Sequence, residues 1–266
     1  VGGIYTALEV AELKVMFDVG LAPRSFASVD DIFVSHGHAD HIGALTTLLG
    51  VRGLVGKGAP RLYVPAEIVD HLQTALAAMS KLQRYELSAE IIGMRPGDEV
   101  ELRGNLRARA FRTFHPVPSL GYQLLRRVTK LKPEHLGMPG PEIALARDRG
   151  DDIFFTEERI EVAYATDTLL RVIESSPEIT RAKVLIMECS FLDERKDIAA
   201  SRAGCHIHLD ELLEHADAFE NEHLVLMHFS QIYRPREVHE ILQRRCPEGL
   251  LQRIIPFTPK RKHWPG

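Results

Sequence analysis

Apolar and polar residues alternate along the chain with two different periods. Residues 13–20, 31–36 and 61–65 are short runs of apolar and β-branched side chains, which is typical of strands. Residues 66–82 place apolar side chains at helical spacing, and residues 41–56 form another helix candidate that ends in glycine. The first third of the chain therefore predicts strands that alternate with helices.

The same alternation resumes later in the chain. Basic and apolar side chains alternate over residues 106–115 and continue over 119–127, which predicts strands with one wet face and one packed face. Further strands are predicted at residues 160–167, 183–191, 223–230 and 253–257, and further helices at residues 169–176, 208–221 and 234–246. No repeat or interior linker is visible. We therefore predict a single α/β domain over residues 1–266, with helices on both faces of its sheets.

The alternation lapses between Thr129 and Glu158, where proline, glycine and charged residues accumulate. We predict a protruding insertion at about residues 126–158. Its candidate phosphate-binding cations are Arg126, Arg127, Lys130 and Lys132. The alternative is a solvated surface loop. Additional candidates for a basic face are Arg103, Arg107, Arg109, Arg112 and the basic segment 259–264.

Composition narrows the classes of function. Apolar residues make up 45% of the chain and charged residues 26%, which is ordinary for a globular protein and excludes wholesale disorder. The net charge of −4 excludes a polycation, so a nucleic-acid partner would need a local basic face. No apolar run approaches the roughly 18 residues of a membrane span, and no export signal is visible. The three cysteines form no CxxC pair, so we expect a reducing cytoplasm and no disulfide framework.

The segment "SHGHADH", residues 35–41, crowds His36, His38, Asp40 and His41 behind a predicted strand. Alternate residues at a strand end point the same way, so the first two histidines can converge on one ion. As the chain turns into a helix, the other two residues face a neighbouring point. Four ligands within six residues do not easily enclose one tetrahedral ion, so we predict two adjacent metal ions. The alternative is a surface histidine cluster.

Other ligands are expected at other strand ends. His115, Asp167 and His228 each close an apolar run just before the pattern breaks. Each of them alone is more typical of a loop or of a hydrogen-bonded core residue. Together with the first cluster they become candidate ligands, because two ions need more donors than one short segment supplies.

The segment "SHGHADHIGAL" resembles the HxHxDH signature of the metallo-β-lactamase superfamily. With "TFHPVPSLGY", "ATDT", "MECSFLD", "CHIHLDEL" and "LMHFSQIY" in this order, nearly the whole chain resembles the short form of tRNase Z. This endonuclease family removes 3′ trailers from precursor tRNA. The resemblance implies an αββα four-layer sandwich and a homodimer in which the arm of one subunit holds the tRNA that the other cuts.

The resemblance also implies a site with two zinc ions, with Mn²⁺ as another possible metal. The first ion would be held by His36, His38 and His115, the second by Asp40, His41 and His228, and Asp167 would bridge them. Asp40 could also accept the proton of the attacking water. His206 would donate a proton to the leaving ribose 3′-oxygen, and Glu188 would orient His206 and keep it protonated.

The match to the family is incomplete at three places. Thr166 and Cys205 stand where the family usually has glycine, and the stretch that corresponds to the tRNA-gripping arm is short. The short arm favours a second hypothesis, a hydrolase of the same fold that acts on a small phosphodiester, a lactone or a thioester. A third hypothesis is a binding or scaffold protein with a degenerate site, but all seven expected ligands are present.

Overall fold

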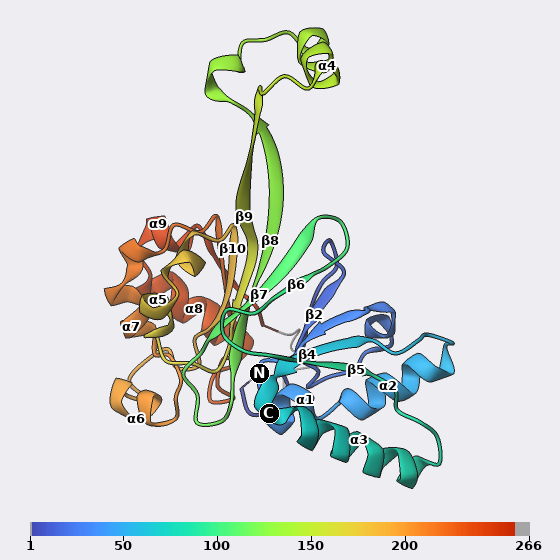
Figure 1. Cartoon of the computed structure of the whole chain (residues 1–266). Helices are drawn as coiled ribbons and strands as arrows, with labels where there is room; N and C mark the ends of the chain where they lie inside the picture. Colours follow the sequence, from blue (N-terminus) through green and yellow to red (C-terminus); the bar gives the residue numbers. More distant parts are fainter. Residues whose placement is uncertain (1, 259–266) are drawn as a thin grey trace.

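The computed structural model describes residues 2–258, in which the strands form two sheets that pack face to face (Figure 1). The strands of the first sheet, in their order across it, are β1 (Leu8–Val10), β2 (Val15–Phe17), β3 (Asp31–Phe33), β4 (Arg61–Pro65) and β5 (Glu90–Met94). β1 is antiparallel to β2, and the other neighbours are parallel.

The second sheet has the order β12-β11-β10-β9-β8-β7-β6. Its strands are β6 (Glu99–Glu101), β7 (Leu106–Arg112), β8 (Leu120–Leu131), β9 (Phe154–Ala165), β10 (Val184–Glu188), β11 (His223–Met227) and β12 (Ile254–Pro256). Strands β9 to β12 run parallel, whereas β6 to β9 are antiparallel.

Helices cover the outer face of each sheet (Figure 1). Those beside the first sheet are α1 (Ala39–Ile42), α2 (Leu45–Leu54) and α3 (Val69–Gln83). Those beside the second sheet are α5 (Val172–Ser175), α6 (Ile198–Ala203), α7 (Leu209–Glu214), α8 (Pro235–Arg245) and α9 (Glu248–Leu251). None of the described helices is both long enough and apolar enough to cross a membrane.

The period of two along each strand divides the core into layers. Phe17, Phe33 and Tyr63 are buried between the sheets, where they pack with Tyr122 and Tyr164 of the second sheet. The residue before each of the first three points to the opposite face and packs against α2 and α3. This alternation explains why one strand can serve two layers at once.

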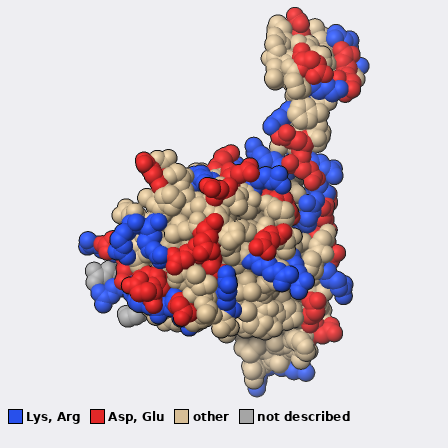
Figure 2. Space-filling model, turned by 90° about the vertical axis from the view of Figure 1, so that its left-hand side faces the viewer, with Lys and Arg blue, Asp and Glu red and all other residues tan. Residues whose placement is uncertain are grey.

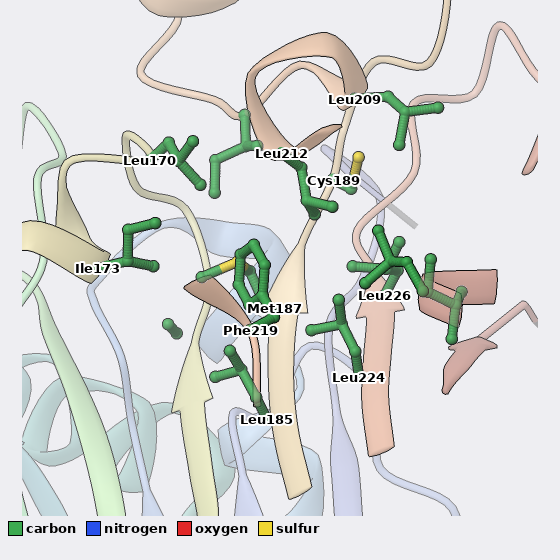
Figure 3. Close-up of a cluster of buried hydrophobic side chains, with 14 of the residues drawn as sticks. Leu170, Ile173, Leu185, Met187, Cys189, Leu209, Leu212, Phe219, Leu224 and Leu226 are labelled. Atoms are coloured by element: carbon green, nitrogen blue, oxygen red, sulfur yellow. The ribbon is translucent and has the colours of Figure 1, made fainter. Parts of the chain in front are cut away.

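A third cluster lies between the second sheet and its helices. Figure 3 shows Leu185 and Met187 of β10 together with Leu224 and Leu226 of β11, which pack in the same cluster as Leu212 of α7. The three clusters separate four layers in the order helix, sheet, sheet, helix. The predicted αββα fold is therefore confirmed.

An arm projects from the second sheet (Figure 1). Strands β8 and β9 stay paired out to Leu131 and Phe154, and helix α4 (Gly140–Arg149) forms the tip. The register of the two strands shifts between Leu124 and Leu125, just before β8 ends its pairing with β7 at Arg126. These outer strand segments escaped prediction because a two-stranded ribbon outside the core has no buried face, so its sequence has no apolar period.

The helices predicted at 66–82 and 234–246 are found at nearly their expected bounds, whereas three others are divided or shortened. The helix expected at 41–56 is divided into α1 and α2 by backbone hydrogen bonds with Val19, whose N–H binds His41 O and whose carbonyl accepts from Ala44 N. The helix expected at 169–176 is reduced to α5, and that at 208–221 to α7 and a short 3₁₀ turn. The basic segment 259–264 lies outside the described residues.

Candidate metal centre

The residues predicted as metal ligands come together at one end of the two sheets. His36 and His38 follow β3, and His115 follows β7. Asp167 and His228 follow the parallel strands β9 and β11. The carboxyl ends of parallel strands meet at one edge of a sheet, which is where ligands bind in α/β folds.

The first group of candidate ligands contains three imidazoles and one carboxylate. Each of its four residues places one ligand atom within 4.8 Å of those of the other three; they are His36, His38, His115 and Asp167. His38 Nδ1 lies 3.0 Å from His36 Nε2 and 3.2 Å from His115 Nε2. Burial lowers the pKa of His36 to about 2, so its ring is neutral and offers a lone pair to an ion.

The second group contains Asp40, His41 and His228, again within 4.8 Å of one another. Asp40 Oδ2 lies 3.5 Å from His41 Nε2 and 3.6 Å from His228 Nε2. Asp167 reaches this group too, with Oδ1 3.1 Å from His228 Nε2 and Oδ2 3.5 Å from His41 Nε2. The carboxylate of Asp167 therefore lies between the two groups.

The ring nitrogens of the second group suit a metal ion. Among the described residues, His41 Nε2 and His228 Nε2 are buried without a hydrogen-bond partner, which is costly for a polar atom. The opposite nitrogens are engaged, His41 Nδ1 with Asp18 Oδ2 at 2.8 Å and His228 Nδ1 with Ser190 Oγ at 3.1 Å. An imidazole fixed at one nitrogen and free at the other is typical of a metal ligand, and imidazole with carboxylate suits zinc.

Backbone strain accompanies the site. Asp167 and His228 have φ angles of 44° and 60°, in the left-handed region that side chains rarely adopt. Thr166, which replaces the glycine of the family motif, does not take the positive φ itself. Its hydroxyl donates to Asp167 Oδ1 at 3.0 Å, so this departure adds a hydrogen bond to the candidate bridging carboxylate. Such strained conformations cluster at functional sites.

Asp18 is a residue of the site that the sequence patterns did not single out. It is fully buried after β2, and its carboxylate accepts hydrogen bonds from Ser35 N at 2.7 Å and Tyr164 OH at 2.6 Å as well as from His41 Nδ1. Burial alone would lower the pKa of His41, but the charge of Asp18 together with the nearby carboxylates of Asp167 and Asp40 raises it well above its usual value. Asp18 closes an apolar run, which is the signal that identified Asp167, and that signal could have found it.

The half-buried His206 and the buried Glu188 form a carboxylate–imidazole pair. His206 Nδ1 lies 3.1 Å from both carboxylate oxygens of Glu188, which also accepts from Thr168 N at 2.7 Å and Ser190 Oγ at 2.6 Å. Burial alone would lower the pKa of His206, but the hydrogen bond and charge of Glu188 raise it to about 9. A ring nitrogen of His206 also lies within 4.8 Å of ligand atoms of Asp167 and His228. The predicted proton donor thus adjoins the predicted metal ligands.

Helix α6 determines where His206 lies. The helix is capped by Asp197, which accepts from Ala200 N at 2.7 Å, and it ends with the N–H of His206 bonded to Ser201 O at 3.0 Å. This ending requires a left-handed residue just before His206, and Cys205 occupies it with φ 57°. Glycine takes this conformation without steric cost, which accounts for the glycine that the family usually has there.

The predicted cations of the arm are largely neutralised. Lys130 pairs with Glu157, Lys132 lies 2.6 Å from Asp152, and Arg126 lies 3.4 Å from Glu161. Of the four, only Arg127 has no acidic partner among the described residues. Residues 126–158 contain six Lys or Arg and seven Asp or Glu, and Figure 2 shows both signs interspersed along the arm. Arg107 and Arg109 are likewise paired, with Glu99 and Glu158.

Comparison with known proteins identifies the class. Residues 12–229 match the β-lactamase superfamily domain. Human short-form tRNase Z has the same fold, with a TM-score of 0.59 at 18% identity over 82% of both chains. YhfI of Bacillus subtilis, a metallo-β-lactamase fold protein, gives a TM-score of 0.57 at 16% identity over 92% of this chain and 89% of its own. The protein belongs to the β-lactamase superfamily.

Sequence relatives narrow the class further. tRNase Z TRZ1 of Arabidopsis thaliana is 34% identical over 260 residues, which cover 97% of this chain and 92% of that protein. Ribonuclease Z of Methanosarcina acetivorans is 30% identical over an alignment of 269 residues, which covers 90% of this chain and 85% of that protein. Within the superfamily, the chain belongs to the tRNase Z family.

The substitution Asp18→Asn is expected to weaken zinc binding by about 10–100-fold, because His41 loses the charged acceptor that orients its ring. A competition titration against a chromophoric chelator measures this affinity. Asp31→Asn is the matched control, since Asp31 is also buried and hydrogen-bonded but lies at the opposite end of β3. Unchanged zinc affinity in folded Asp18→Asn protein would contradict the orienting role.

Proposed function

We propose that the protein is a zinc-dependent, cytoplasmic endoribonuclease that removes the 3′ trailer of precursor tRNA. One observation carries this proposal: the His206–Glu188 pair adjoins two convergent groups of histidine and aspartate in a chain of the tRNase Z family. Hydrolysis of a phosphodiester needs an activated water, charge neutralisation and a proton for the leaving oxygen. The side chains at this end of the sheets are of the types that supply all three.

The donor set supports two zinc ions per subunit, with Mn²⁺ as an alternative. In this proposal His36, His38 and His115 hold one ion, Asp40, His41 and His228 hold the other, and Asp167 contacts both. Bound zinc would supply Lewis-acid activation of water and of the phosphodiester.

The protein's own side chains move the protons. Burial alone would raise the pKa of Asp40, but the neighbouring rings of His228 and His41 lower it well below its usual range, so this carboxylate is ionised. In this proposal Asp40 accepts the proton of the attacking water. Glu188 holds Nδ1 of His206, which leaves Nε2 as the atom that donates to the departing 3′-oxygen. The raised pKa of His206 keeps that proton in place at neutral pH.

The position of the arm supports a homodimer. Strand β8 begins beside the metal centre, where Leu120 N donates to Ser35 O at 2.9 Å, and it ends at Leu131 near the tip. Twelve extended residues span about 40 Å, so the tip lies far from its own site. In the proposed dimer the arm of one subunit, including Arg126, Arg127, Lys130 and Lys132, contacts precursor tRNA bound at the site of the other.

A second candidate function is favoured by the paired charges of the arm. Cations that already have acidic partners give up those pairs before they contact phosphate, which weakens binding to RNA. The same site could then hydrolyse a small phosphodiester, a lactone or a thioester without the arm.

Zinc-loaded protein is expected to cleave a precursor tRNA transcript at the base of its 3′ trailer, leaving a 3′-hydroxyl on the tRNA. Gel analysis of the products tests this, with bis(p-nitrophenyl) phosphate as a parallel small substrate. Cleavage of the small ester alone, at enzyme concentrations above that of the transcript, would sink the tRNA proposal and favour the second candidate.

The substitution His206→Ala is expected to lower kcat for precursor tRNA by about 10²–10⁴-fold, because the leaving oxygen loses its proton donor. Metal analysis should find the zinc content per chain unchanged. His239→Ala, at an exposed histidine of α8, is the control and should keep the wild-type kcat. Loss of zinc from the His206 variant would show that this ring is a metal ligand instead.

A variant with a truncated arm tests whether the arm of one subunit serves the site of the other. Arg126 and Arg159 are partners in the ladder between β8 and β9, so residues 127–158 can be replaced by an Asn-Gly turn, which removes Arg127, Lys130 and Lys132. The KM for precursor tRNA is expected to rise about tenfold, as one of two contacts is lost, while that for the small ester stays constant. Mixing this variant with His206→Ala protein should restore tRNA cleavage; an unchanged KM for tRNA in the truncated enzyme would argue against the arm.

A further inference from the structure

Two arginines converge on one phenylalanine at the rim of the metal centre. The guanidinium carbon of Arg112 lies 5.1 Å from the ring centre of Phe114, and that of Arg171 lies 4.9 Å from the same centre. Arg112 ends β7 and Arg171 precedes α5, so distant parts of the chain bring the two cations together. Both arginines are exposed, and the ring is half-buried.

The backbone of Phe114 is linked to the candidate catalytic groups. Phe114 directly precedes His115, and its N–H donates to Thr168 Oγ1 at 2.9 Å. The N–H of Thr168 in turn donates to Glu188 Oε1 at 2.7 Å. The ring that carries the two cations therefore belongs to the residue next to a predicted metal ligand, and its backbone is linked through Thr168 to Glu188.

Neither cation has an acidic partner in the part of the chain that the structure describes. Arg107 and Arg109, on the same strand as Arg112, are paired with carboxylates, whereas the guanidinium groups of Arg112 and Arg171 lie on the phenyl ring and form no ion pair with the described residues. Like charges that converge on one surface repel each other, and an anion between them would remove that repulsion. Cation–π contact also restricts both guanidinium groups before an anion arrives, which reduces the entropy lost on binding.

We propose that Arg112 and Arg171, presented on Phe114, bind the phosphodiester backbone of the RNA strand next to the scissile bond. A guanidinium group binds phosphate oxygens through two parallel hydrogen bonds. The two arginines would therefore orient the RNA strand as well as attract it. This inference rests on the proposed function and adds a site on the body of the protein to the arm. Substrates with a single phosphodiester, such as bis(p-nitrophenyl) phosphate, lack the neighbouring phosphate and do not use it.

The test compares Arg112→Ala, Arg171→Ala and the double variant with Arg181→Ala. Arg181 is also exposed, without an acidic partner among the described residues, but precedes β10, at the end opposite Glu188. Each single change is expected to lower kcat/KM for precursor tRNA about tenfold and to reduce the slope of log(kcat/KM) against log salt by about 0.7, as expected for one lost phosphate contact on a single strand. Activity on the small ester should stay within about twofold, and Arg181→Ala should match wild type.

Binding of a fluorescein-labelled hexauridylate, followed by anisotropy in EDTA, separates this inference from the proposed function. Weaker binding by the arginine variants supports the site even in the absence of tRNA cleavage. Wild-type kcat/KM and wild-type hexauridylate binding in the double variant would overturn the inference. An equal loss with tRNA and with the small ester would overturn it too, because it would show that the arginines only hold Phe114 and His115 in place. Lysine at both positions should keep the salt slope while recovering part of the rate.

Discussion

The hydrogen bonds of the buried Asp18 carboxylate are the interactions on which the candidate metal centre depends. The carboxylate binds the backbone after β3, the ring of His41 and the hydroxyl of Tyr164, so that one charge ties together both sheets and the first candidate ligand segment. A charge removed from water in this way is stable only when all its oxygens are engaged. Hydrogen bonds from three elements meet that requirement, and they fix where the strand ends lie relative to one another.

The second sheet also contains a buried carboxylate that orients an imidazole. Glu188 is as deeply buried as Asp18, and it orients His206 as Asp18 orients His41. Serine assists each carboxylate: Ser35 Oγ contacts Asp18 and the first sheet's histidines, while Ser190 Oγ contacts Glu188 and His228. Each sheet therefore contributes a buried carboxylate and a serine to the candidate site, and the imidazoles that they bind have little freedom to reorient.

The candidate metal ligands are easier to predict from the sequence than the residues that hold them in place by hydrogen bonds. A histidine or aspartate at the end of an apolar run stands out, and the structure brings all seven such residues together at one end of the sheets. The partners of a carboxylate do not stand out, because Tyr164 and Asp18 are far apart in the chain and meet only through the packing of two sheets. The same holds for the arm, where acidic residues of β9 neutralise the cations that β8 displays.

The two strands that carry the arm also end at the metal centre, β8 beginning beside Ser35 and β9 leading into Asp167. In a two-stranded ribbon with uninterrupted pairing, each displacement of the tip would also displace the candidate metal ligands. The register shift between Leu124 and Leu125 interrupts the ladder between the two ends. A bulge bends a strand and interrupts its hydrogen-bond pairing, so we expect bending of the arm to concentrate there and not at the candidate ligands.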